Sequence, residues 1–89
     1  MIGPKSDKWL NEIGIYSIDD LKGVGAIPAF IKLKQETNMK PSLNMLYAMV
    51  AKIEGRDWRD VAKQDKGQLL MAIEGYLELE DILKQDQSL

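Results

Sequence analysis

Residues 21–33 read L-K-G-V-G-A-I-P-A-F-I-K-L, and this stretch says most about how the chain folds. One apolar residue separates Gly23 from Gly25, and a small residue, Ala29, follows four positions after the second glycine. Glycines permit a tight turn and leave the backbone uncovered. The apolar residues from Ala26 onward have the spacing of one face of a helix. The stretch therefore predicts two helices joined by a tight turn.

Two glycines around an apolar residue, followed by a helix, are typical of a helix-hairpin-helix motif. The first N–H groups of the second helix carry partial positive charge and suit a phosphate. Residues 2–6, I-G-P-K-S, are similar to the second half of the same motif. The sequence thus predicts DNA phosphate-binding residues at Gly3, Lys5, Ser6, Lys8, Lys22, Gly23 and Gly25.

Structural interpretations of both turns remain open. Gly3, Lys5 and Ser6 are also compatible with an ordinary helix N-terminus. Asp7 places a negative charge close to this candidate site. In the second turn Ile27 occupies the position where a basic residue would contact a phosphate, which favours a purely structural hairpin there.

Helical periodicity extends through nearly the whole chain, and no segment alternates with period two. We expect an all-α fold, a compact bundle of about five helices with helix-hairpin-helix, SAM-like elements. The predicted helices run from Pro4 to just before Gly14, over about 18–22, from Ala26 through Leu33, over about 43–54 and from Asp65 onward, with a single turn over 58–62. Their predicted N-caps are Ser17, Ser42, Asp57 and Asp65.

The helix over about 43–54 has apolar residues on two sides, including Met45 and Met49, so we expect it to be the most buried. The last helix has one clear stripe, formed by Leu69, Leu70, Ile73, Tyr76 and Leu77. Beyond Glu78 the pattern blurs, and residues 78–89 form an acidic end. We expect Gln85 to Leu89 to fray.

The composition excludes several classes of function. The 89 residues include no cysteine and no histidine, so disulfides, Cys-His or Ser-His-Asp catalysis and thiolate zinc sites are impossible. We expect no enzyme activity, no cofactor and no metal site. The longest wholly apolar run, residues 45–51, is far too short to span a membrane, and the N-terminus lacks a signal core. We expect one cytoplasmic domain over residues 1–89.

Charge is distributed unevenly along the chain. Residues 1–66 contain eleven Lys and Arg against nine Asp and Glu, a net charge of +2. Residues 67–89 contain one Lys against five Asp and Glu, a net charge of −4. A mildly basic body is therefore followed by an acidic helix. Its residues Glu74, Glu78 and Asp81 share one face, which is either solvated or available to a basic partner.

A basic and aromatic cluster surrounds Trp58, with Lys52, Arg56, Arg59 and Lys63 nearby. Such a cluster is compatible with nucleic-acid binding through stacking and phosphate contacts. Acidic residues interleave it, however, so the local charge nearly cancels. This favours a second interpretation, in which Trp58 packs in the core and the charges are solvated.

Several short motifs occur in an order that resembles the C-terminal domain of the TfoX/Sxy competence regulators. They are I-G-P-K-S at 2–6, W-L-N-E-I-G-I at 9–15, S-I-D-D-L at 17–21, G-A at 25–26, P-S-L-N-M-L-Y-A at 41–48 and G-R-D-W-R-D at 55–60. The resemblance covers about residues 2–75. It implies an all-helical fold and a bacterial role in positive control of DNA-uptake genes, together with the cyclic-AMP receptor protein in the better-known members. Long members carry a further N-terminal domain, so we expect an excised domain or a short stand-alone relative.

We therefore expect a non-enzymatic module of transcription regulation that acts through contacts with the transcription machinery or the cyclic-AMP receptor protein, and through weak DNA backbone contacts. The alternative is a pure protein-interaction or dimerisation domain whose hairpins are structural. A third interpretation is an accessory fragment of a DNA-processing enzyme. The sequence leaves the partner, the promoter and the oligomeric state open.

Overall fold

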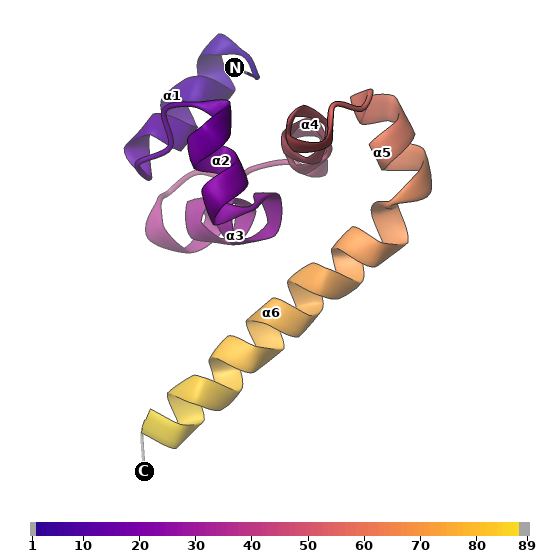
Figure 1. Cartoon of the computed structure of the whole chain (residues 1–89). Helices are drawn as coiled ribbons and strands as arrows, with labels where there is room; N and C mark the ends of the chain where they lie inside the picture. The colour runs from indigo at the N-terminus through magenta and orange to yellow at the C-terminus, as the bar shows by residue number, and fades with distance from the viewer. Residues whose placement is uncertain (1, 88–89) are drawn as a thin grey trace.

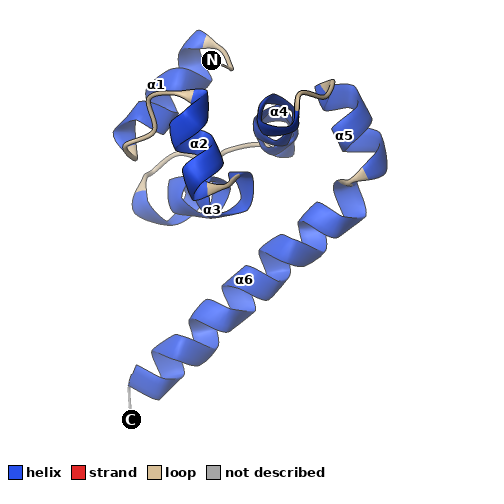
Figure 2. Cartoon of the chain, in the orientation of Figure 1, coloured by secondary structure: helices blue, strands red, loops and turns tan. Residues whose placement is uncertain are grey.

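Six helices and no strand make up residues 2–87, the part of the chain that the computed structural model describes (Figures 1 and 2). The side chains of Glu80 and of residues 84–87 are outside the description. The helices are α1 (Pro4–Glu12), α2 (Ile18–Val24), α3 (Ala26–Glu36), α4 (Leu43–Glu54), α5 (Trp58–Gln64) and α6 (Lys66–Gln87). The predicted all-α fold is confirmed. The predicted count of five is corrected to six, because the turn expected over 58–62 is a seven-residue helix, α5.

Three helices begin at the side-chain caps that the sequence predicts. The hydroxyl of Ser17 accepts a hydrogen bond from the backbone N–H of Asp20 at 3.1 Å. The hydroxyl of Ser42 accepts one from the N–H of Met45 at 3.3 Å, and a carboxylate oxygen of Asp57 accepts one from the N–H of Arg59 at 2.9 Å. Each cap satisfies an N–H group that has no partner within its own helix, so it fixes the start of α2, α4 or α5 locally.

Gly25 alone joins α2 to α3, and its conformation requires glycine. Its φ is +95°, a region that L side chains rarely adopt, and an added Cβ would lie 3.3 Å from Cδ of Pro28. Gly23 differs, because it lies inside α2 and a Cβ there would meet nothing within 4 Å. Helix α2 thus extends to Val24, beyond the expected range of about 18–22.

Helix α4 is the centre of the core, as predicted. It lies against α2, α3 and α5, and half of its twelve residues are buried. These are Met45, Leu46, Tyr47, Met49, Val50 and Ala51. Both methionines lie in the core, which confirms their predicted role.

Helix α6 leaves the body diagonally after its first half and ends at Gln87 (Figure 1). Its early residues lie against α3 and α5, and among its described side chains only Ile73 is buried. The predicted stripe is therefore only partly covered, since Leu70 and Tyr76 each remain more than a third exposed. The chain is helical as far as Gln87, and the fraying expected from Gln85 onward stays a prediction. Ser88 and Leu89 lie outside the described residues.

Candidate functional site

The first turn of α1 is closed by its own carboxylate. One oxygen of Asp7 accepts hydrogen bonds from the backbone N–H of Ile2 at 2.9 Å and from that of Gly3 at 3.4 Å. The bond from Ile2 is the main cause that lowers the pKa of Asp7 below its ordinary value. A group predicted for phosphate binding, the N–H of Gly3, thus already contacts a negatively charged oxygen of the same chain.

Lys5 and Ser6 line a hollow of about 310 Å³ between α1 and α4. We call it the α1–α4 hollow, and its lining residues are Lys5, Ser6, Trp9, Lys40, Ser42 and Met45. The ammonium of Lys5 lies 5.4 Å from the ring centroid of Trp9, within the range of a cation–π interaction. Two exposed lysines and two serines therefore border one space beside an aromatic ring.

This arrangement suits one or two phosphate groups. Lys5 and Lys40 can supply positive charge, and the hydroxyl of Ser6 can donate a hydrogen bond. Both α1 and α4 begin at the hollow, so the positive ends of two helix dipoles lie beside it. The sequence predicts a phosphate site at the first turn of α1 but does not predict that Lys40 lies beside it. Its position just before the motif P-S-L-N was a usable signal.

The other predicted phosphate-binding residues do not line this hollow. Lys8 lies exposed on α1, and Lys22 and Gly23 lie exposed on α2. Gly25 forms the joint between α2 and α3. The structure brings Lys5 and Ser6 together with Lys40, and the roles of Lys8, Lys22, Gly23 and Gly25 stay predictions.

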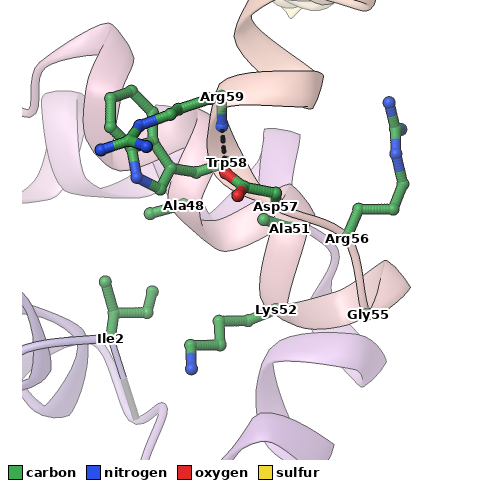
Figure 3. A pocket seen from close by; sticks show the side chains of 9 residues that line it. All are labelled: Ile2, Ala48, Ala51, Lys52, Gly55, Arg56, Asp57, Trp58 and Arg59. Carbon is green, nitrogen blue, oxygen red and sulfur yellow. Dashed lines mark hydrogen bonds between the residues drawn. The ribbon is translucent and has the colours of Figure 1, made fainter.

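A larger hollow of about 550 Å³ lies where α4 meets α5 (Figure 3). We call it the α4–α5 hollow. Its lining residues are Ile2, Ala48, Ala51, Lys52, Gly55, Arg56, Asp57, Trp58 and Arg59. Small and apolar side chains, Ile2, Ala48 and Ala51, form its floor. Ile2 is far in the sequence from the two alanines of α4, so no single stretch of sequence predicts this floor.

Trp58 borders this hollow with 43% of its surface exposed, so the prediction that it packs in the core is wrong. The reason is the shortness of α5, which buries only Val61 and leaves Trp58 at its open first turn. The guanidinium of Arg59 lies 5.6 Å from the Trp58 ring centroid (Figure 3). The result is an exposed aromatic ring with a cation over it.

Arg56 is neutralised by carboxylates instead of facing a ligand. Its guanidinium donates to Asp65 at 2.7 Å, to Asp60 at 2.8 Å and to Glu54 at 2.8 Å. The hydrogen bond to Asp65 is the main cause that raises the pKa of Arg56, and the same bond lowers the pKa of Asp65. The Asp65 carboxylate, predicted to cap α6, is thus engaged with Arg56. The cluster ties the end of α4 to α5 and to the start of α6.

Two kinds of feature are absent from the described residues. No group of three or more Asp or Glu side chains is placed to hold a metal ion. None of the helices described is long and apolar enough to cross a membrane.

Comparison with the models of known protein families gives a match. The family model of the TfoX C-terminal domain matches residues 2–73, which is most of the chain and includes the lining residues of both hollows. No curated protein and no solved structure matches the chain.

Proposed function

The chain belongs to the TfoX C-terminal domain family, and from that premise we propose that it is a non-enzymatic regulatory module in the positive control of competence and DNA-uptake genes. The lack of cysteine and histidine supports a role without catalysis, because no thiolate nucleophile and no histidine, the commonest general base, are present. Its action then depends on contacts with other macromolecules. The transcription machinery or the cyclic-AMP receptor protein is the partner that the family resemblance suggests.

The α1–α4 hollow carries the second part of the proposal, a weak contact with the DNA backbone. Lys5 and Lys40 border one space with Ser6, which supports binding of one or two phosphates. Asp7 opposes a stronger grip, because its carboxylate already accepts from the N–H of Gly3. Phosphate contacts position a protein without reading bases, so the binding should not depend on sequence.

A titration of the ¹⁵N-labelled domain with a short DNA duplex at low salt tests this contact. The amides of Lys5 and Ser6 and the indole N–H of Trp9 should shift, while the indole N–H of Trp58, in the other hollow, should not. The logarithm of the affinity should fall with the logarithm of salt with a slope of about −1 to −2, as expected for one or two phosphates.

Charge variants distinguish phosphate binding in the α1–α4 hollow from a general electrostatic attraction between the domain and DNA. Lys5→Glu and Lys40→Glu should abolish the shifts. Lys34→Glu is the matched control, since it makes the same charge change on an exposed residue of α3 outside the hollow. Removing residues 78–89 should strengthen binding modestly at low salt, because it removes acidic residues. Equal losses in all three lysine variants, or no shift at Lys5 and Ser6, would contradict the DNA contact.

A pure protein-interaction domain is the second candidate function. The observation that favours it is the exposed ring of Trp58 beside an apolar floor, since Trp and Arg are enriched at the centres of protein interfaces. If the duplex leaves every amide of the folded domain unshifted, this second candidate takes first place.

A further inference from the structure

The α4–α5 hollow has the chemistry of a docking site for an acidic, apolar segment. Its floor is formed by Ile2, Ala48 and Ala51, and its rim carries Lys52 and Arg59 beside the exposed Trp58 (Figure 3). The third cation at this place, Arg56, is already bonded to three carboxylates of the chain. Lys52 and Arg59 are therefore the cations that an acidic ligand would meet at the rim. The proposed DNA contact uses none of these residues.

The second half of α6 has the complementary chemistry. Leu79 is 55% exposed, Ile82 49% and Leu83 51%, although all three are large apolar side chains. The exposed carboxylates of Glu78 and Asp81 lie within one turn of them. Contiguous apolar side chains on the surface of a small domain usually mark an interaction site.

We propose that a second copy of this chain covers the α4–α5 hollow with the second half of its own α6. Leu79 and Ile82 of one copy then pack on the apolar floor and against Trp58 of the other. Glu78 and Asp81 lie near Lys52 and Arg59. The charge match supports this occupant, because the body carries a net +2 and residues 67–89 a net −4.

The contact has to form between molecules, because α6 runs away from the hollow of its own chain. Figure 1 shows the C-terminal end of α6 on the opposite side of the molecule from the junction of α4 and α5. Two copies that exchange these helix ends reciprocally fill both hollows and make a closed two-fold dimer.

A charge-swap experiment tests the contact by sedimentation equilibrium and light scattering of the full chain. One set of chains carries Lys52→Glu and Arg59→Glu, and a second set carries Glu78→Lys and Asp81→Lys. The unaltered chain should dimerise, and each altered chain alone should dimerise at least about tenfold more weakly. An equimolar mixture of the two sets should form the heterodimer, since both of its hollow-to-helix contacts again join opposite charges. Dimerisation of the mixture no stronger than that of either set overturns the proposal.

Uncharged and control variants complete the test. Leu79→Ser should weaken the dimer at least about tenfold without unfolding the domain, because the side chain is exposed in the single chain. Lys8→Glu, an equal charge change on α1, should leave the dimer unchanged. In spectra of the unaltered chain the indole N–H of Trp58 should shift with protein concentration and that of Trp9 should not. A chain that stays monomeric at millimolar concentration, or a dimer insensitive to Leu79→Ser, overturns the proposal. Neither of these two results bears on DNA binding, because the DNA titration is followed separately at the indole N–H of Trp9.

Discussion

Helices α4 and α6 contain similar kinds of residue and have opposite environments. Helix α4 buries half of its twelve residues, whereas among the described side chains of the 22-residue α6 only Ile73 is buried. Both show apolar residues at helical spacing. They differ in their neighbours, because α4 lies among α2, α3 and α5, while the second half of α6 extends past the body (Figure 1). Periodicity therefore predicts a helix, and the neighbouring elements decide whether its apolar face is covered.

The largest effect should come from one substitution made in both helices. Leu46→Ala removes a fully buried side chain from α4 and should lower the free energy of unfolding by about 2–5 kcal/mol. Leu79→Ala makes the same change on the exposed part of α6 and should cost less than about 0.5 kcal/mol in the monomer. Urea unfolding at low protein concentration measures both. Equal losses would show that α6 is as tightly packed as α4.

A second effect concerns Gly25 in the body. Gly25→Val should lower the free energy of unfolding by more than about 1 kcal/mol, because it combines a positive φ with a close contact to Pro28. Gly23→Ala is the control in the same turn, since its Cβ meets nothing within 4 Å. An unchanged urea midpoint and slope for Gly25→Val would show that the turn adopts another conformation in solution.

Gly75, in the open middle of α6, should respond in the opposite direction. Its φ is not positive, and an added Cβ meets nothing within 4 Å, so Gly75→Ala should stabilise the helix by up to about 1 kcal/mol. Hydrogen exchange should show slower exchange in α6 and little change in α4. In the unaltered chain the amides from Leu46 to Ile53 should exchange more slowly than those of α6. If the amides of α4 exchanged faster than those of α6 in the unaltered chain, the contrast between a buried α4 and an exposed α6 would be contradicted.

The smallest effect should appear on acidification, at the cluster that ties α6 to α4. Because the pKa of Asp65 is lowered on folding, the unfolded chain binds this proton more readily. The stability that ionised Asp65 contributes is fully present above the ordinary pKa of Asp, near 3.9. It is lost as the pH falls through the lower pKa that Asp65 has in the folded chain. The urea midpoint should fall in that range, and less so in Asp65→Asn. If Asp65→Asn had the same pH profile as the unaltered chain, the hydrogen bond between Asp65 and Arg56 would contribute nothing to the stability of the fold.

Features set by neighbouring residues could be predicted from the sequence alone. The caps at Ser17, Ser42 and Asp57 and the glycine at 25 depend on contacts within a few positions, so the order of residues was enough. The all-α class followed from helical periodicity along nearly the whole chain. The candidate phosphate residues Lys5 and Ser6 were found because the motif that carries them is continuous.

Features that join distant segments needed the tertiary structure. Lys40 borders the same hollow as Lys5, and Ile2 lines the same hollow as Ala48, only because the fold brings the N-terminal residues beside α4 and the loop before it. Trp58 was expected in the core, yet α5 is too short to cover it.

The amino-acid sequence thus determined where helices form, because capping, backbone freedom and periodicity act over a single turn. Only the tertiary structure decided which apolar faces are buried and which charges are paired. Burial depends on the elements that surround a face, and the pairing of Arg56 with Asp65 depends on where α6 starts relative to α4. Interactions within a single turn determine where the helices form, and the way the helices pack leaves the second half of α6 and the α4–α5 hollow exposed.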